Sequence, residues 1–182
     1  MKLIGSTTSP FVRRIRLQLK DQDYEFICVN IFSEEGQREV RKYTTTGRIP
    51  ILVDGETVIW DSLLIANYLS KEPFELETQK QLVLVNEMTD AGIALFQLRK
   101  FEIDGEDKGV FSQNHLKRIK SVLDYFEVYG LKDWNVVSQW IYCTLDWFEF
   151  RNVFPWREEH PKLIAFYEKN HSRLEVKSSN PR

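Results

Sequence analysis

The chain has 182 residues, of which 42% are hydrophobic and 13% aromatic, enough to build packed cores in one large domain or two small ones. Its formal net charge is −2 and its acidic and basic residues are interspersed, so neither nucleic acid nor an anionic membrane surface is an expected partner. No apolar run approaches the ~18 residues of a membrane span, and the start of the sequence turns polar too soon for a signal peptide, so we expect a cytoplasmic protein.

The first third of the chain alternates short apolar runs with helical periodicity, which is typical of a mixed α/β domain. We expect, in chain order, strand 2–5, a helix from Pro10, strand 24–31, a charged helix from Ser33 to about residue 43, strands 49–53 and 57–60, and helix 62–70. Pro10 suits the first turn of a helix because its φ is fixed. Asp54-Gly55, between two apolar runs, predicts a hairpin turn.

Residues 71–74 interrupt this pattern, and nearly everything after them has helical periodicity. We therefore expect two domains, one α/β over residues 1–72 and one all-helical over residues 77–182. The second domain is predicted to contain helices over about 78–101, 112–129 and 136–151 and a last helix from near Pro161, with a polar break at residues 104–107. Asn135 is the predicted N-cap of the helix that follows it.

Ile49-Pro50 stands at the entrance of a predicted strand, directly after Gly47-Arg48 and before the hairpin. In this context the sequence indicates a cis peptide bond, although cis bonds occur at only about 5 to 6% of X-Pro positions. Such a bend leaves the main-chain N–H and C=O of Ile49 unpaired, so an extended peptide could pair with them as an added strand. The alternative is an ordinary proline at a sheet edge.

Asp61-Ser62 marks the point where the last predicted strand ends and a helix begins. The free N–H groups of a helix N-terminus and a serine hydroxyl can bind a carboxylate, and Asp61 beside them can bind an ammonium group. Together they fit the α-amino acid end of a γ-glutamyl group. The alternative is a helix cap that binds no ligand.

Three segments of the first domain follow one another in a family-specific order: Ser9-Pro10-Phe11-Val12, Gly47-Arg48-Ile49-Pro50-Ile51-Leu52, and residues 61–69. They resemble the active-site stretch and the glutathione-binding motifs of bacterial-type cytosolic glutathione S-transferases. The first segment is similar to that of the serine-type tau class and of the omega class, except that omega enzymes have cysteine at position 9. In the second domain, residues 134–138 fall where the family has a capping motif, with Ser138 in place of the usual aspartate. The resemblance implies a thioredoxin-like first domain followed by the family's helical domain.

The resemblance also implies which residues bind glutathione: Ser9, Arg48, Ile49, Pro50, Asp61 and Ser62. Ser9 would donate its hydroxyl hydrogen to the glutathione sulfur and stabilise the thiolate. The backbone of Ile49 would pair with the cysteinyl unit, the Asp-Ser pair would hold the γ-glutamyl end, and Arg48 would reach the glycyl carboxylate. Thr7 and Thr8 lie close enough in sequence to take the place of Ser9 at the sulfur.

The activity that the resemblance implies is conjugation of glutathione, as co-substrate, to a small apolar electrophile, with a role in detoxification and a homodimeric assembly. Two alternatives stay open. A non-enzymatic interaction protein is favoured by the short helical domain and by Thr44-Thr45-Thr46, which replaces the asparagine-proline turn common in the family. The other alternative is a glutathione-dependent isomerase resembling the zeta class. A disulfide reductase is disfavoured because position 9 is not cysteine.

The remaining reactive side chains favour structural roles. Cys28 and Cys143 lack metal-ligand spacing and are expected to be small buried hydrophobic residues, and no metal is expected. We expect the three histidines, His115, His160 and His171, at the surface or at helix caps. A cluster of four basic residues, Arg13, Arg14, Arg16 and Lys20, predicts a solvated helix face, with attraction of an anionic tripeptide as the alternative. Three apolar residues, Met88, Ile93 and Trp147, are expected in the core rather than along an electrophile site.

Overall fold

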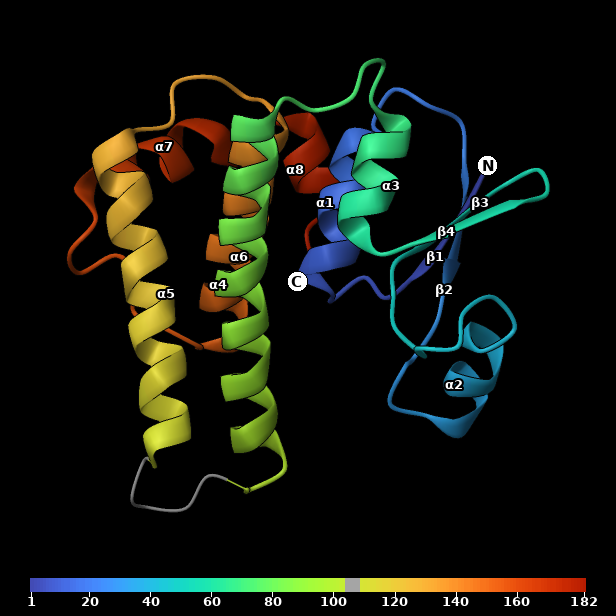
Figure 1. Cartoon of the computed structure of the whole chain (residues 1–182), viewed down its shortest axis with the longest axis horizontal. Coiled ribbons are helices and arrows are strands. Elements are labelled where there is room, and N and C mark those ends of the chain that lie inside the picture. Colours follow the sequence, from blue (N-terminus) through green and yellow to red (C-terminus); the bar gives the residue numbers. More distant parts are fainter. Residues whose placement is uncertain (104–108) are drawn as a thin grey trace. The chain divides into compact units, whose positions relative to one another are not determined.

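The computed structural model describes residues 1–103 and 109–182, which form two compact units (Figure 1). The first unit comprises Met1–Glu75 together with Leu174–Arg182, and the second comprises Leu76–Arg173. The first unit is a thioredoxin-like α/β unit and the second is helical, which confirms the expected fold class. The polar break expected at residues 104–107 lies outside the described residues.

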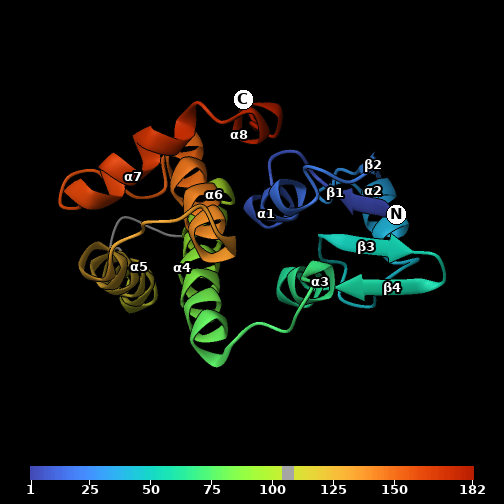
Figure 2. The ribbon, with the colours of Figure 1, turned by 90° about the horizontal axis from the view of Figure 1, so that it is seen from above.

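The first unit contains a four-stranded sheet with the strand order β2-β1-β3-β4. Its elements are β1 (Lys2–Gly5), α1 (Pro10–Gln18), β2 (Glu25–Cys28), α2 (Glu34–Val40), β3 (Ile51–Asp54), β4 (Thr57–Trp60), α3 (Ser62–Leu69) and α8 (Leu174–Ser178). β1 pairs in parallel with β2 and antiparallel with β3, and β3 pairs antiparallel with β4. α1 and α3 contact each other and lie on the same face of the sheet (Figure 2).

The core of this unit lies on both faces of the sheet. On one face Ile4, Val29 and Ile51 pack with Val40 of α2, and on the other the sheet packs against α1. The predicted inward residues Val12, Ile15 and Leu19 are fully buried, as are Leu3 and Ile4 of β1. A methyl group at Gly5 would lie 2.5 Å from Val12 Cγ2, which shows how closely β1 approaches the helix. This contact anchors the N-terminal half of α1 against the sheet.

Two expectations about the first unit are wrong. Arg13 and Arg14 are buried, so this side of α1 is not a solvated face. The guanidinium of Arg14 lies 4.7 Å from the centre of the Phe11 ring, and Arg13 binds main-chain and side-chain oxygens of residues 176–179. Cys28, at the end of an outer strand, is exposed, whereas Cys143 is buried as expected.

The second unit consists of α4 (Leu76–Lys100), α5 (Val110–Tyr129), α6 (Val136–Arg151) and α7 (Pro161–His171). α4 contacts both α5 and α6, and α5 contacts α7 (Figure 2). α6 has the predicted bounds, and Asn135 is its N-cap. Asn135 accepts a hydrogen bond from the Ser138 N–H, and Ser138 Oγ accepts one from the Asn135 N–H. Ser138 therefore completes a capping box with Asn135.

The apolar residues of this unit are mostly where the periodicity predicts them. Met88 and Trp147 are buried, which agrees with the expected core role, and Ile93 is half-buried. His160 is only 2% exposed, so of the two positions expected for the histidines, the surface or a helix cap, it has the second. It occupies the N-cap position of α7 without a side-chain capping bond, and its ring contacts the Trp156 carbonyl and the Asp124 carboxylate instead.

Candidate functional site

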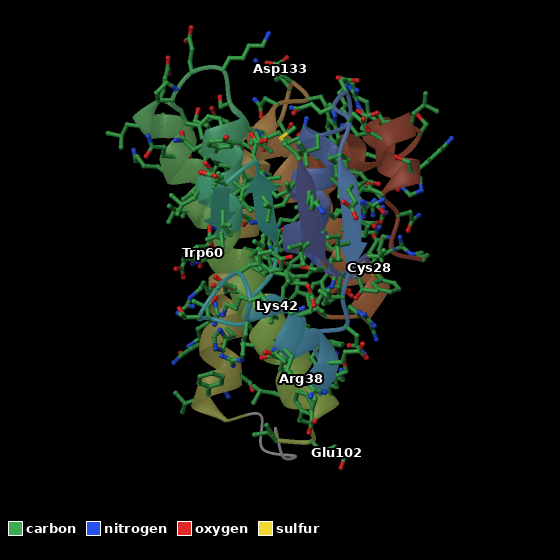
Figure 3. The ribbon with its side chains drawn as sticks, turned by 90° about the vertical axis from the view of Figure 1, so that its right-hand side faces the viewer. Cys28, Arg38, Lys42, Trp60, Glu102 and Asp133 are labelled. Atoms are coloured by element: carbon green, nitrogen blue, oxygen red, sulfur yellow. The ribbon has the colours of Figure 1, made fainter. Side chains whose placement is uncertain are left out.

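The strand registers bring three loop segments of the first unit to one end of the sheet. Ile51, at the start of β3, is opposite both Ile4 of β1 and Trp60 of β4. The residues that follow β1, precede β3 and follow β4 therefore leave the sheet at the same end. Figure 3 labels Trp60 and Cys28, the last residues of the two outer strands, at this level of the sheet. The candidate site consists of Ser9, Arg48, Ile49, Asp61 and Ser62.

Ser9 is the N-cap of α1, and its side-chain oxygen accepts a hydrogen bond of 3.3 Å from the Val12 N–H. Among the described residues nothing accepts the hydroxyl hydrogen of Ser9, so this hydrogen is available to a ligand. The Thr8 hydroxyl is paired with Ser6 Oγ at 3.1 Å, while Thr7 is exposed. Of the three hydroxyls that are candidates for a ligand contact, that of Thr8 is therefore already hydrogen-bonded to another side chain, whereas those of Thr7 and Ser9 have no side-chain partner within residues 1–103 and 109–182.

Ile49 precedes a cis peptide bond to Pro50, as the sequence indicates. Within residues 1–103 and 109–182, neither the N–H nor the C=O of Ile49 takes part in a hydrogen bond. Main-chain groups without partners are uncommon in folded proteins unless water or a ligand reaches them. An extended peptide that lies beside Ile49 can pair with both groups.

Arg48 is held by a short threonine turn. Thr44 Oγ1 accepts a hydrogen bond from the Thr46 N–H at 3.2 Å, and Thr46 Oγ1 accepts one from the Arg48 N–H at 3.4 Å. Gly47 between them has φ +65°, a conformation that favours glycine. The guanidinium of Arg48 is exposed and has no acidic partner among the described residues. The threonine turn therefore fixes the main chain of Arg48 and leaves its side chain available to an anion.

Asp61 and Ser62 have different roles at the start of α3. Asp61 is the N-cap, and its Oδ1 accepts a hydrogen bond of 2.7 Å from the Leu63 N–H, so the capping interpretation holds for this residue. Ser62 is only 1% exposed, and its Oγ has no hydrogen-bond partner among the described residues. A buried hydroxyl without a partner costs about 1 to 3 kcal/mol, which an acceptor atom of a ligand would recover.

The combination of groups defines the kind of ligand that fits. The Ser9 and Ser62 hydroxyls can donate, Ile49 presents a peptide-like donor and acceptor, Arg48 presents a cation, and the Asp61 carboxylate presents an anion. A short peptide with charged ends satisfies this set.

No group of three His, Cys, Asp or Glu side chains in the described part of the chain could hold a metal ion. No described helix is long and apolar enough to cross a bilayer.

One contact beside the site has no counterpart in the sequence predictions. Arg13, one turn after Ser9, binds the Val176 carbonyl of the short helix α8 and the hydroxyl of Ser179 directly after it. No local pattern reveals this contact, because its partners are more than 160 positions away in the sequence.

Comparison with known proteins gives a family-model match within the first unit and similar proteins over longer stretches of the chain. Residues 3–75 match the family model described as "Glutathione S-transferase, N-terminal domain". The chain is 29% identical to the uncharacterized GST-like protein YibF of Escherichia coli, in an alignment that covers 100% of this chain and 98% of that protein. Over 60 residues it is 45% identical to a zeta-class glutathione S-transferase of Euphorbia esula, which corresponds to 32% of this chain and 27% of the relative.

A similar fold is present among solved structures. A glutathione S-transferase from Methylobacillus flagellatus, solved with glutathione bound, superposes with a TM-score of 0.86 over 100% of this chain and 99% of that chain. The sequence identity is 20%, so this similarity establishes the fold. Both units take part in it, because the superposition extends over the whole chain.

Proposed function

Because the chain carries a glutathione S-transferase N-terminal domain and has the fold of that family over its whole length, we propose that it is a glutathione transferase that conjugates glutathione to a small apolar electrophile. The observation that carries the proposal is the set of polar groups without partners among the described residues at one end of the sheet. The set includes the hydroxyl hydrogen of Ser9, the main chain of Ile49 and the buried Oγ of Ser62.

In this proposal each part of glutathione meets a group of matching chemistry. The cysteinyl N–H and C=O pair with the main chain of Ile49, next to Pro50. The γ-glutamyl carboxylate accepts hydrogen bonds from the N-terminus of α3 and from Ser62, and the γ-glutamyl ammonium group binds Asp61. Arg48 binds the glycyl carboxylate. The sulfur then lies near Ser9.

Ser9 acts by stabilising the thiolate, because a serine hydroxyl is not a base. A free thiol has a pKa of about 8.5, so a shift of roughly 2 units, or about 2.7 kcal/mol, makes it mostly thiolate at pH 7. One hydrogen bond to a charged group contributes about 1.5 to 3 kcal/mol, and the N-terminus of α1 adds about 0.3 to 1 kcal/mol. The thiol proton leaves to solvent, and the sulfur electron pair forms the new bond to carbon as the leaving group departs.

The proposal includes a cytoplasmic homodimer with a role in detoxification. Exposed apolar side chains on two contacting elements of the first unit support self-association: Trp60 at the end of β4 is 40% exposed, and Leu64 and Tyr68, one turn apart on α3, are 60% and 47% exposed. Exposed apolar groups of this kind mark interaction surfaces when they are contiguous. Sedimentation of the wild type and of Leu64→Lys tests this part, and a wild type that sediments as a monomer excludes it.

A zeta-like isomerase is the second candidate function. The 45% identity to a zeta-class glutathione S-transferase over 60 residues supports it. An isomerase of this kind adds the glutathione thiolate to a cis-enone diacid and releases it again, so glutathione is not consumed. The two candidate functions share the binding site and differ in the fate of the adduct.

Calorimetric titration with glutathione, followed by two turnover assays, tests the proposal. One assay uses a chloronitrobenzene electrophile and the other a cis-enone diacid. We expect the wild type to bind glutathione, and Ser9→Ala to reduce kcat/KM about tenfold or more because a hydrogen bond to the thiolate is lost. Thr7→Ala serves as the comparison, since it removes a nearby exposed hydroxyl.

Three outcomes would contradict parts of this account. Absence of glutathione binding contradicts the function altogether. Binding without turnover in either assay indicates a non-enzymatic interaction protein. A silent Ser9→Ala together with a large loss in Thr7→Ala moves the sulfur contact to Thr7.

A further inference from the structure

The last nine residues of the chain fold against α1 within the first unit. Arg13 Nη2 donates to the Val176 carbonyl at 3.1 Å, and Arg13 Nε donates to Ser179 Oγ at 3.3 Å. Arg16, one turn further along α1, donates from Nη2 to the Ser178 carbonyl at 3.1 Å. Two arginines of α1 therefore supply the C-terminal carbonyls of α8 with donors, which such carbonyls lack within their own helix.

Ser179 extends these contacts into a short chain of hydrogen bonds. Its hydroxyl accepts from Arg13 and donates to the Glu175 carbonyl at 2.7 Å, while the Ser179 N–H also donates to that carbonyl at 3.3 Å. Arg13, Val176 and Ser179 are each no more than 2% exposed. Because the guanidinium group of Arg13 is planar and buried, its two hydrogen bonds, to Val176 and to Ser179, fix both the position and the orientation of this segment relative to α1. A lysine cannot do this.

The same turn of α1 carries Ser9. The Arg13 N–H donates to the Ser9 carbonyl at 3.0 Å, and the Val12 N–H donates to Ser9 Oγ. Residues 9–13 therefore form one hydrogen-bonded turn, with the candidate sulfur contact at its start and the anchor to α8 at its end. The Arg13 side chain therefore lies at the end of the turn that Ser9 begins, and the electrostatic benefit of a helix N-terminus falls off within one turn.

We propose that Arg13 is a positioning residue for the thiolate site, and that residues 174–182 act through it to fix the first turn of α1. This inference rests on the proposed glutathione transferase function. It assigns the C-terminal segment a role in setting the acidity of the bound thiol, although the segment is farther along the sequence than any residue of the candidate site.

The test uses full-length Arg13→Lys and Ser179→Ala, with Lys20→Gln as a matched control because Lys20 is an exposed cation just after the same helix. Hydrogen exchange of the Ser9, Val12 and Arg13 amides and the pH profile of kcat/KM are the two measurements. We expect faster exchange in the first turn of α1 in both variants. The acidic midpoint of the profile should rise by about half a pH unit, and kcat/KM near pH 7 should fall about three- to tenfold, with Lys20→Gln unchanged.

Ser179→Ala keeps the test informative if Arg13→Lys does not fold, because it removes one acceptor and leaves the arginine in place. Unchanged exchange in residues 9–13 overturns the inference. Faster exchange with an unchanged pH midpoint also overturns it, since the contact is then only structural. If the wild type neither binds nor turns over glutathione, the proposed function fails, and the exchange data alone still decide whether residues 174–182 hold the first turn of α1.

Discussion

Gly92 of α4 lies directly against the ring of Phe148 of α6, and a methyl group at position 92 would lie only 2.4 Å from Phe148 Cε1. Phe148 is fully buried, and because protein interiors are close-packed its ring can move only by displacing its neighbours. One turn earlier, the hydroxyls of Thr89 and Thr144 share a buried hydrogen bond of 2.8 Å between the same two helices. The absence of a side chain at Gly92 thus allows α4 and α6 to approach closely.

Gly92→Ala is expected to destabilise the protein by about 1 to 3 kcal/mol, although alanine at an ordinary helix position gains about 1 kcal/mol over glycine. Urea unfolding measures the change. Adding Phe148→Leu should recover part of the loss, because the smaller side chain leaves room for the methyl group, and a double-mutant cycle isolates this coupling. Equal stability of Gly92→Ala and the wild type would show that the two helices are not in close contact.

The capping box of α6 gives a second prediction. Ser138→Ala removes the acceptor of the Asn135 N–H, at 2.8 Å, and should cost about 1 kcal/mol. Asn135→Ala removes the reciprocal bond and should cost a similar amount. Because the two bonds belong to one motif, the double variant should lose less than the sum of the single losses. Strictly additive losses would argue against a cooperative box.

The buried hydroxyl of Tyr167 should make the protein less stable at high pH. Burial, and next the hydrogen bond that its hydroxyl donates to Asp146, raises the pKa of Tyr167 above its ordinary value of 10. Above about pH 10 the unfolded chain releases the Tyr167 proton, while the folded protein keeps it. The stability that the Tyr167 hydroxyl contributes is therefore complete below about pH 10 and falls as the pH rises further. The unfolding free energy of Tyr167→Phe should decline less steeply between about pH 10 and 11. Identical slopes for the two proteins would contradict this explanation.

Ser62→Ala should have opposite effects on the stability of the free protein and on its affinity for glutathione. Without a ligand the variant should be as stable as the wild type or more stable by up to about 1 kcal/mol, because it removes a buried hydroxyl that lacks a partner among the described residues. With glutathione, its affinity should be about tenfold lower, because a hydrogen bond to a carboxylate is lost. Ser33→Ala, which removes the 3.1 Å acceptor of the Gly36 N–H at the start of α2, should instead lower the stability of the free protein. A destabilised Ser62→Ala would mean that its hydroxyl already has a partner.

Elements with strong local signals could be predicted from the sequence. The Asn135 cap and the apolar periodicity after it predict α6 as Val136–Arg151, which is the observed helix. The cis bond between Ile49 and Pro50 could be predicted because the strand entrance and the neighbouring hairpin supply a context that the dipeptide alone does not. Roles of the individual site residues toward glutathione stay predictions.

Features that depend on distant contacts could not be predicted. The five residues of α8 have no periodicity long enough to identify a helix, and their C-terminal carbonyls are satisfied by side chains of α1. For the same reason the pattern of charges on α1 suggests a solvated face, whereas Arg13 is covered by the end of the chain. The exposure of Cys28 depends on the order of strands in the sheet, which places β2 at an edge.

The most direct test of the central claim is a titration of the isotopically labelled protein with glutathione, followed through the amide resonances in NMR spectra. The account predicts saturable shifts of the amides of Ile49 and Ser62 and of the first turn of α1, with a slowed exchange of the Ile49 amide hydrogen because it gains an acceptor. Saturable binding that shifts other amides and leaves Ile49 and Ser62 unchanged, or no binding at all, would contradict it.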